Sequence, residues 1–272
     1  MIRKHFLSRS VSRHVAKYPD SILSSAFPQT HDFELDYAEF LDEALAEEYE
    51  LAESLARNGR ASAEGRDWWI LKPGMSDRGQ GIRLFSTEEE LAGIFESFEI
   101  VEDEDEDGDV EEGSAEECGG NSDTQIITNQ LRHFVAQKYI HPPLLVDRRK
   151  FHIRAYVLAV GGLRVYVYKP MLALFAAKEY SPPWEGSTDL SGHLTNTCLQ
   201  TGGGSEGAVR LFWDMESNVP GGQDAMEGIW KSICTITGET FRAAATGQRI
   251  HFQASPLFFV VQYKGGGGGD RI

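Results

Sequence analysis

The sequence predicts a mixed α/β (α+β) protein in which helices and strands follow one another around a sizeable core. Its 272 residues are 41% hydrophobic and 25% charged, which is ordinary globular composition. Runs with strand character and stretches with helical periodicity occur along the whole chain. No apolar run reaches the roughly 20 residues that a membrane-spanning helix needs, so we expect no membrane span.

The first half of the chain predicts a helix, a pair of strands and a second, short helix. Apolar residues recur at helical spacing over residues 37–57, and Asn58-Gly59 provides a stop. Residues 68–72 and 81–85 are typical of strands, and a stretch rich in turn residues separates them. Thr87 and Glu90 have the spacing of a capping box, which predicts a short helix after the second strand. Two strands therefore flank a glycine loop.

The second half predicts more strands and one long helix. Residues 134–140 form a strand, and residues 150–160 and 163–169 form a hairpin because two glycines separate them. Residues 224–244 have the apolar spacing of a helix. Residues 258–261 are typical of a strand, and the five glycines that follow predict a disordered tail.

The formal net charge of −16 is concentrated in one segment. Residues 99–117 contain twelve acidic residues and no Lys or Arg, so the rest of the chain carries only −4. Such a block repels itself and cannot offset its own ordering entropy, which predicts a solvated insertion loop. The alternative is a contact for a basic partner. Because the remaining chain is mildly acidic, we expect no direct reading of nucleic acid.

The cysteines and the N-terminus bear on the cellular compartment. Cys118, Cys198 and Cys234 are widely spaced with no CxxC pair, which favours a reducing compartment and offers no zinc site. Residues 1–18 contain five basic residues and no acid, which is typical either of a mitochondrial transit peptide or of a basic helix that begins the domain.

Two segments of the first half carry groups suited to a nucleotide. Lys72 ends a predicted strand and precedes a glycine loop. The ammonium of Lys72 and the bare backbone N–H groups of the loop could together hold a polyphosphate. The alternative is a tight surface hairpin. Residues 137–140 end a strand, where backbone groups could pair with a purine edge, or they are plain core.

Two further segments lie in the second half. Side chains alternate along a strand, so Lys150, His152, Arg154 and Tyr156 share one face, and two cations with a histidine favour an anion there. The alternative is a solvated outer face. The string His193-Leu194-Thr195-Asn196 brings together groups that orient a ribose or a phosphate, although in isolation it would be a turn.

In order and spacing these segments resemble the tubulin–tyrosine ligase family, whose members have the ATP-grasp fold. The strings that carry the resemblance are Trp69-Ile70-Leu71-Lys72-Pro73, Arg78-Gly79-Gln80-Gly81-Ile82, Gln137-Lys138-Tyr139-Ile140, Arg149-Lys150-Phe151-His152-Ile153-Arg154-Ala155-Tyr156-Val157-Leu158 and His193-Leu194-Thr195-Asn196. The sequence is most similar to the fungal members associated with processing bodies.

The resemblance implies an ATP-grasp-like fold with two sheet layers flanking a nucleotide cleft. Residues 1–64 would be the N-terminal helical, basic part of the ligase domain, and residues 65–256 its core. Residues 99–123 would be a disordered acidic insertion, and residues 257–272 an aberrant glycine-rich tail. The basic N-terminus then belongs to the domain.

The resemblance also implies roles for individual residues toward ATP. Lys72 would contact the α and β phosphates, and Arg78 with Gly79 would close over the β and γ phosphates. The adenine would lie against Gln137, Lys138, Tyr139 and Ile140. Lys150 and His152 would bind the nucleotide near its ribose and phosphates, and Thr195 with Asn196 would lie near the triphosphate. Arg154 would be catalytic, as the cation that stabilises an acyl phosphate.

Three departures from the family pattern bear on activity. His152 stands where most members have an aspartate, and Leu174 where many have an arginine. The family continues into strands whose Asp and Glu-x-Asn oxygens hold Mg²⁺, so the fold is expected to be cut short at its C-terminal end. The nearest remaining acids are expected in loops or the tail, so we assign no metal ligand; they are Asp189, Asp214 and Asp270.

We therefore expect an ATP- and Mg²⁺-dependent ligase that activates a protein or peptide carboxylate as an acyl phosphate for attack by an amino acid amine. The resemblance suggests the tubulin C-terminal tail as a protein substrate and tyrosine as an amino acid. It also suggests a cytoplasmic location that includes processing bodies. The alternative is a catalytically inactive ATP-grasp relic that serves as a binding module in a processing-body or cytoskeletal assembly.

Overall fold

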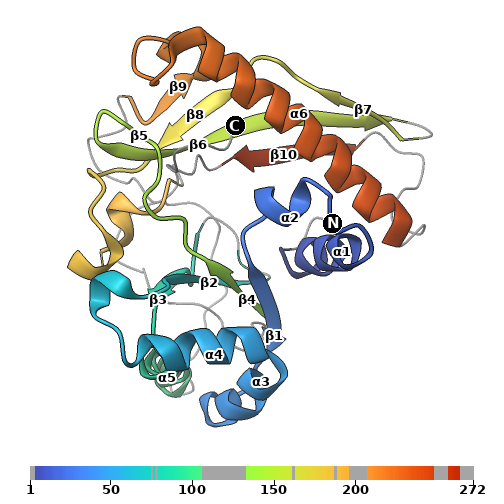
Figure 1. Cartoon of the computed structure of the whole chain (residues 1–272). Coiled ribbons are helices and arrows are strands. Elements are labelled where there is room, and N and C mark those ends of the chain that lie inside the picture. The colour runs from blue at the N-terminus through green and yellow to red at the C-terminus, as the bar shows by residue number, and fades with distance from the viewer. Residues whose placement is uncertain are drawn as a thin grey trace. The chain divides into compact units, whose positions relative to one another are not determined.

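Figure 1 shows the computed structural model of the chain, which describes residues 4–74, 76, 79–105, 133–160, 163–186, 189–195, 207–247 and 257–263. The chain divides into two compact units. Unit 1 comprises Met1–Pro28 and Ile140–Ile272, and unit 2 comprises Gln29–Tyr139. Each unit contains a sheet and helices, so the predicted mixed class is confirmed.

The sheet of unit 2 has four strands in the order β1-β4-β2-β3, and every neighbouring pair is antiparallel. The strands are β1 (Thr30–Glu34), β2 (Trp69–Pro73), β3 (Arg83–Phe85) and β4 (His133–Lys138). The three strands predicted in this part of the chain are confirmed, with bounds shifted by one to two residues. The sequence did not predict β1, whose short THDFE run has only His31 and Phe33 buried.

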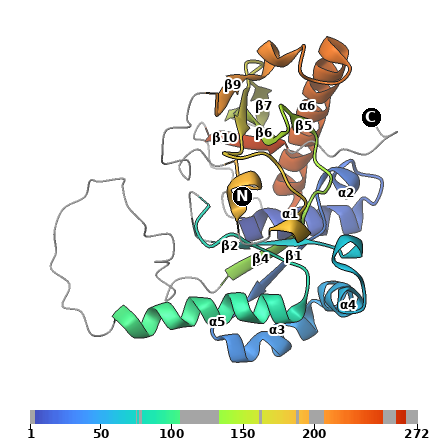
Figure 2. The same cartoon turned by 90° about the vertical axis from the view of Figure 1, so that its left-hand side faces the viewer.

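Helices cover one face of this sheet (Figures 1 and 2). They are the short η1 (Ala38–Phe40) and η2 (Ala63–Gly65), then α3 (Leu41–Glu47), α4 (Tyr49–Asn58) and α5 (Glu88–Asp105). The single helix predicted over residues 37–57 is wrong, because the backbone breaks at Glu48 with φ −108° and ψ 60°. In a continuous helix Leu45 and Leu51 would lie about 120° apart around the axis. The break lets both leucines enter one core, in which they are buried.

The core of unit 2 lies between these helices and the sheet. Four aromatic rings form its centre: Phe33 and Phe134 come from β1 and β4, and Phe95 and Phe98 from α5. The Phe95 and Phe134 rings pack edge to face with centroids 4.9 Å apart. Burial of these large apolar side chains is the main stabilising term of the unit.

The predicted capping box at the start of α5 is confirmed. The Glu90 N–H donates to Thr87 Oγ1 at 3.2 Å, and the Thr87 N–H donates to Glu90 Oε2 at 3.3 Å. The helix is longer than expected, since it continues to Asp105. Residues 99–105 of the predicted acidic loop are therefore helical, and residues 106–123 lie outside the described part of the chain.

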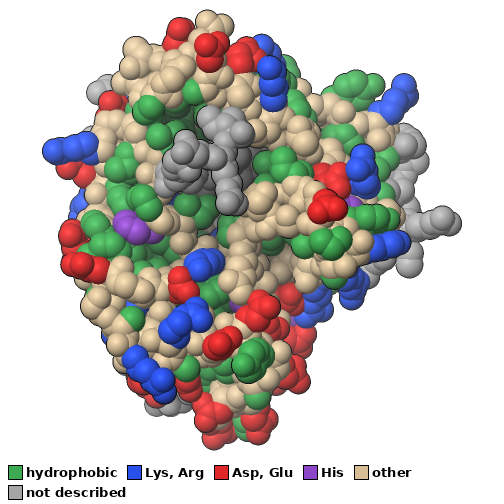
Figure 3. Space-filling view, viewed as in Figure 1, with side chains coloured by type: hydrophobic (Ala, Val, Ile, Leu, Met, Phe, Trp, Pro, Cys, Tyr) green, Lys and Arg blue, Asp and Glu red, His purple; other side chains and the backbone are tan. Residues whose placement is uncertain are grey.

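Acidic side chains also gather on the surface of unit 2. In Figure 3 they cover the lower part of the view, where α3 and α4 lie in Figure 1. The exposed acids of these helices are Asp42, Glu43, Glu47, Glu50 and Glu53. The helices α3 and α4 therefore give this part of unit 2 an acidic surface.

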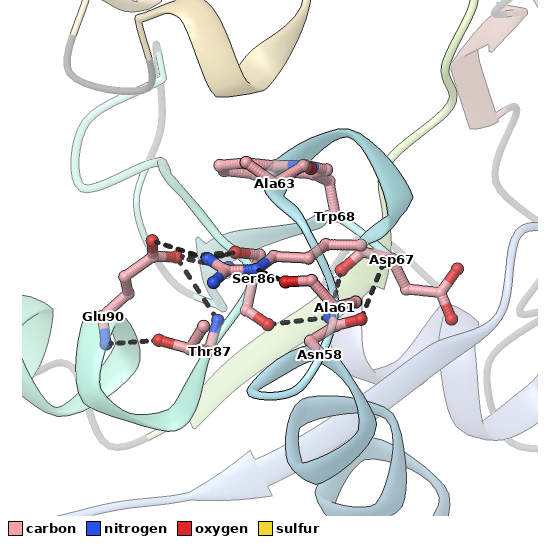
Figure 4. A network of polar contacts seen from close by, with 9 residues as sticks. Asn58, Ala61, Ala63, Asp67, Trp68, Ser86, Thr87 and Glu90 are labelled. Carbon is pink, nitrogen blue, oxygen red and sulfur yellow. Dashed lines mark hydrogen bonds and ion pairs between the residues drawn. The ribbon is translucent and has the colours of Figure 1, made fainter.

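A polar network ties the end of α4 to the strands (Figure 4). The buried Asn58 amide donates to the carbonyls of Asp67 and Ser86, both at 2.7 Å, and its oxygen accepts from the Asp67 N–H at 2.9 Å. One side chain therefore satisfies three backbone groups, two of Asp67 and one of Ser86. Because buried backbone polar groups need partners, this residue fixes where β2 begins and β3 ends.

The sheet of unit 1 has six strands, with β6 at its centre. The path is β10-β6-β8-β9, and β5 and β7 also pair with β6. The strands are β5 (Leu145–Val146), β6 (Arg149–Val160), β7 (Arg164–Val167), β8 (Leu172–Phe175), β9 (Val209–Leu211) and β10 (Leu257–Tyr263). The predicted β6–β7 hairpin and the predicted strand near the C-terminus are confirmed.

One long helix, α6 (Gly222–Gly247), crosses one face of this sheet (Figure 1). The other helices of unit 1 are α1 (Lys4–Lys17), α2 (Leu23–Ala26), η4 (Pro183–Glu185), η5 (Leu190–Gly192) and η7 (Phe212–Met215). The basic N-terminal segment forms α1, which packs against α6 and favours the interpretation as a domain helix. Within the described residues no helix combines the length and apolar character that crossing a membrane requires.

A partly buried polar cluster joins α1 to α6. His14 Nε2 lies 2.8 Å from Glu239 Oε1, and Ser21 Oγ donates to the same oxygen at 3.1 Å. Arg242 contacts the other Glu239 oxygen at 2.8 Å. The His14 hydrogen bond is the largest cause that lowers the pKa of Glu239, and the Ser21 hydrogen bond and the Arg242 charge add to it.

Replacing the Asn58 side chain should destabilise unit 2. We expect Asn58→Ala to lower the free energy of unfolding by about 2–4 kcal/mol, because three buried backbone groups lose their partner. Arg57→Ala is the matched control, since it removes an exposed ion pair with Asp67 that contributes less than about 1 kcal/mol. Urea unfolding followed by circular dichroism measures both. Equal losses in the two variants would contradict the role of Asn58.

The Glu239 cluster should make stability depend on acid pH. Because the pKa of Glu239 is lower in the folded state, its contribution is complete above its ordinary pKa and is lost as the pH falls through the folded value. We expect Glu239→Gln to lose less stability than the wild type when the pH is lowered from about 6 to about 3. Parallel pH profiles of the unfolding free energy would contradict this assignment.

Candidate functional site

The predicted site residues are divided between the two units. Lys72, Gly79, Gln137, Lys138 and Tyr139 belong to unit 2, and Ile140, Lys150, His152, Arg154 and Thr195 belong to unit 1. Arg78 and Asn196 lie outside the described residues. Lys72, Gln137 and Lys138 lie on the neighbouring strands β2 and β4, and Lys150, His152 and Arg154 lie on β6. The other four residues lie outside the strands, namely Gly79, Tyr139, Ile140 and Thr195.

In unit 2, Lys72 and Gln137 lie together on neighbouring strands. Lys72 Nζ donates to Gln137 Oε1 at 2.5 Å, and the Gln137 amide donates to Thr30 Oγ1 at 3.0 Å. In the register of β2 and β4, Lys72 pairs with Val135, so Gln137 is its diagonal neighbour on the same face. Three strands thus present one half-buried polar row whose charge is positive.

Lys138 points to the opposite face of β4, as alternation requires. Its Nζ lies 2.9 Å from Asp67 Oδ1. Burial opposes ionisation of Asp67, but the hydrogen bonds from Lys138 and Arg57 outweigh it and lower the pKa of that carboxyl. The backbone N–H groups of Lys138 and Tyr139 donate to the carbonyls of Gln29 and Trp68. The ammonium of Lys138 is therefore held by an ion pair away from the Lys72 row.

The loop between β2 and β3 uses glycine where the backbone requires it. Gly79 and Gly81 have φ values of 89° and 69°, a region that side chains with a Cβ rarely adopt. Ser76 Oγ donates to the Gln80 carbonyl at 2.8 Å across the loop. The predicted glycine turn between the two strands is therefore present.

In unit 1, the even-numbered side chains of β6 form the second group. Phe151, Ile153 and Ala155 enter the core beneath α6, so Lys150 and His152 lie on the opposite face. Both are buried, at 3% and 1% exposure, which excludes a solvated outer face at this end of the strand. A buried lysine is rare in proteins unless an anion or another polar partner accompanies it.

His152 and Thr195 meet although 43 residues separate them. His152 Nδ1 hydrogen-bonds Thr195 Oγ1, and both side chains are buried. On the neighbouring strand β8, the residue opposite His152 is Leu174, which is also buried. The contact explains why a histidine fits at this position: it orients the hydroxyl of the segment that follows η5.

An aromatic and imidazole cluster surrounds the Lys150 ammonium. Lys150 Nζ lies 5.9 Å from the centroid of the Tyr180 ring, and that ring packs edge-on against His193 at 5.5 Å. His141 Nδ1 hydrogen-bonds the Tyr180 hydroxyl at 2.6 Å. Burial, followed by the positive charge of Lys150, lowers the pKa of His193 to about 4. The same two causes, in the same order, lower the pKa of His141.

Sequence reasoning missed Tyr180 and His141 as parts of this cluster. Each stands at the start of a Pro-Pro break, His141-Pro142-Pro143 and Tyr180-Ser181-Pro182-Pro183. Trp184 packs edge-on against the His141 ring at 4.9 Å and joins the two breaks. The paired Pro-Pro turns were the available signal, but nothing local in the sequence shows that the two turns meet.

Arg154 continues the β6 row toward the exposed part of the strand. It is half-buried, and among the described residues its buried Nε has no hydrogen-bond partner. A buried guanidinium nitrogen normally has an acceptor, so this position favours an anionic ligand. Lys150 and Arg154 thus provide two cations on one side of a single strand.

The described acidic residues do not form a metal site. Among the residues that the structure describes, no group of three His, Cys, Asp or Glu side chains lies close enough to hold a metal ion. Asp189 pairs with Lys178 at 2.9 Å, and its hydrogen bond from Ser191, then that from Lys178, lowers its pKa. Asp214 lies in η7, and Asp270 lies outside the described residues. We therefore assign no residue to Mg²⁺.

Known proteins match this chain along most of its length. The tubulin-tyrosine ligase family matches residues 1–261. A probable tubulin–tyrosine ligase of Schizosaccharomyces pombe is 48% identical over 253 residues, which cover 93% of this chain and 61% of the relative. The probable tubulin–tyrosine ligase PBY1 of Saccharomyces cerevisiae is 42% identical over 274 residues, which cover 95% of this chain and 35% of the relative.

A solved structure supports the fold. The C-terminal domain of K. lactis Pby1, an ATP-grasp enzyme that interacts with the mRNA decapping enzyme Dcp2, matches with a TM-score of 0.61 and 36% identity. The match covers 97% of this chain and 62% of that domain, so the chain spans less than two thirds of these relatives. The predicted ATP-grasp fold is confirmed, and by the extent of these matches the chain belongs to the tubulin-tyrosine ligase family.

Proposed function

We propose that this chain carries the nucleotide-binding and activating part of an ATP-dependent ligase that joins a protein or peptide carboxylate to an amino acid amine. The observation that carries the proposal is the row of Lys150, His152 and Arg154 on β6, in a chain of a ligase family with an ATP-grasp fold. The buried Lys150 fits a triphosphate, and the Nε of Arg154 fits the activated carboxylate.

The reaction has two balanced steps. A carboxylate oxygen attacks the γ-phosphorus of ATP and displaces ADP, which gives an acyl phosphate. The amine then attacks the acyl carbon, loses a proton, and releases inorganic phosphate. Lys150 would offset the charge of the phosphates, and Arg154 would stabilise the charge that develops on the acyl phosphate. His152 would hold the Thr195 hydroxyl in place through their hydrogen bond.

The remaining assignments rest on the family resemblance. Lys72, Arg78 and Gly79 would contact the phosphates, the 137–140 segment would hold the adenine, and Asn196 would lie near the triphosphate. Mg²⁺ would accompany ATP, although the described residues offer no set of ligands for it. We propose a cytoplasmic location that includes processing bodies.

The substrates are proposed from the relatives. Tubulin–tyrosine ligase names suggest tyrosine as the amine and a tubulin C-terminal tail as the protein substrate. The buried Leu174, which stands opposite His152, offers no charge to an acidic tail. A carboxylate on another protein therefore fits the described residues as well as a strongly acidic tail does.

A second candidate is a binding module of an mRNA decapping or cytoskeletal assembly. Two relatives favour it: K. lactis Pby1 interacts with Dcp2, and the human inactive polyglycylase TTLL10 is 34% identical over 133 residues, 48% of this chain and 17% of that protein. Such a module would keep the fold and its surface without turnover.

The activity of Arg154 variants separates the two candidates. With ATP, tyrosine and detyrosinated tubulin, we expect ADP formation that Arg154→Ala lowers by about 100-fold or more, while ATP binding changes far less. Arg60→Ala, which alters an exposed arginine, is the control and should keep full activity. If the wild type shows no turnover, and if the wild type and Arg154→Ala recover the same partners from a fungal lysate, the binding-module proposal is favoured over the ligase proposal.

The ionisation of His193 tests the geometry around Lys150. We expect the His193 ring to stay neutral across about pH 5.5 to 8, because burial and Lys150 hold its pKa at about 4. Lys150→Met should raise that pKa, but burial should still keep it below the ordinary value of 6.5. NMR of the imidazole nitrogens measures both proteins. A wild-type pKa near 6.5, or no change in the variant, would contradict the cluster.

A further inference from the structure

The region around β6 to β8 has a charge opposite to that of the chain. Residues 149–178 contain six Lys or Arg and no Asp or Glu, whereas the whole chain has a formal net charge of −16. Lys169 and Lys178 are ion-paired with Glu227 and Asp189, but within the described part of the chain Arg154 and Arg164 form no ion pair and give their face of the sheet positive charge. A ligand that contacts this sheet is therefore selected for negative charge.

Beyond Arg154, the same face of the sheet is covered by exposed tyrosines. Tyr156 follows Arg154 on that face of β6, because Ala155 and Val157 are buried in the core. On β7, Val165 and Val167 pack against the core, which turns Tyr166 and the following Tyr168 to the face of Tyr156.

The strand register brings the three tyrosines side by side. Tyr166 stands opposite Leu158, and the Tyr168 N–H donates to the Tyr156 carbonyl at 2.8 Å, so Tyr156 and Tyr168 are cross-strand neighbours. Arg164 lies at the next position of β7 on this face. We call Arg154, Tyr156, Arg164, Tyr166 and Tyr168 the tyrosine face.

This concentration of exposed rings is unusual for a surface that only meets water. Tyr156, Tyr166 and Tyr168 are 40%, 53% and 62% exposed. Within the described residues no hydrogen bond engages their hydroxyls. Tyrosine and arginine are the residues enriched at binding surfaces, because each offers a flat contact area together with polar atoms.

We propose that the tyrosine face binds the carboxylate-bearing substrate as an extended peptide, with its carboxylate at Arg154 and its preceding residues over Tyr156, Tyr166 and Tyr168. The proposal rests on the proposed function, in which Lys150 and Arg154 serve the phosphates and the activated carboxylate. Along β6 the order is then nucleotide, reacting carboxylate and bound peptide, with Tyr156 roughly 7 Å beyond Arg154.

The chemistry of the surface defines the partner. The carboxylate would pair with Arg154, and Arg164 would attract further acidic groups. Aromatic and proline side chains would pack on the tyrosine rings. The face therefore fits a peptide in which aromatic or proline residues precede glutamates or a free C-terminus. Arg154 and Arg164 would disfavour a basic peptide on this face.

Binding of a defined peptide without nucleotide tests this surface apart from catalysis. The probe is a fluorescein-labelled peptide of sequence Gly-Ser-Phe-Pro-Phe-Pro-Glu-Glu, followed by fluorescence anisotropy. We expect saturable binding to the wild type. Replacing the glutamates by glutamines with a C-terminal amide, or the Phe and Pro residues by Ser, should each weaken binding about tenfold.

Variants of the face provide the second half of the test. Tyr166→Thr combined with Tyr168→Thr, which keeps residues of high β propensity at both positions, should weaken binding about tenfold, as should Arg154→Gln. Tyr37→Thr is the matched control, since Tyr37 is 57% exposed in extended backbone of unit 2. It should bind the probe like the wild type. Thermal unfolding checks that all variants fold.

The outcomes are distinct from those of the ligase assay. No saturable binding to the wild type, or equal binding to the double tyrosine variant, would overturn the proposal even if the chain hydrolyses ATP. Loss of probe binding in the tyrosine and Arg154 variants would support it even if turnover is absent. Analytical sedimentation tests a third outcome. If the wild type forms dimers that exclude the probe, and the double tyrosine variant does not form them, the face is a self-association surface and the proposal is overturned.

Discussion

The strict alternation of β6 is the constraint on which the site of unit 1 depends. One set of its side chains fills the core beneath α6, and this burial fixes the register of the strand against β8, β7 and β10. The other set is then forced onto the opposite face in a fixed order: lysine, histidine, arginine, tyrosine. A slip of one residue would bury the cations in the core and expose the apolar side chains, so packing energy holds the polar row in place.

Burial is what gives this row its chemical character. Lys150 and His152 are nearly inaccessible to solvent. The Tyr180 ring lies near the Lys150 ammonium, and the Thr195 hydroxyl hydrogen-bonds His152. The depressed pKa of His193 follows from the same burial and from the adjacent ammonium. A lysine buried on this face can offset the charge of an anionic ligand, which connects the packing of the strand with the proposed binding of a triphosphate.

Much of this could be predicted from the sequence because the signals are local. A period of two along β6, the capping box of α5 and the glycine turn depend on neighbouring residues only. The break at Glu48 was missed because the helical pattern continues through it, and only the shared core of Leu45 and Leu51 requires the change of direction. The pairs His152–Thr195 and His141–Tyr180 join residues 43 and 39 positions apart, so only the folded chain brings them together.

The central claim is that the Lys150 row binds a nucleotide, and calorimetric titration with ATP tests it most directly. The wild-type chain should bind ATP, and Lys150→Met should bind it at least about tenfold more weakly, which corresponds to about 1.4 kcal/mol. Lys169→Met, which alters an exposed lysine paired with Glu227, should bind like the wild type. No binding by the wild type, or equal affinities in the wild type and Lys150→Met, would contradict the account.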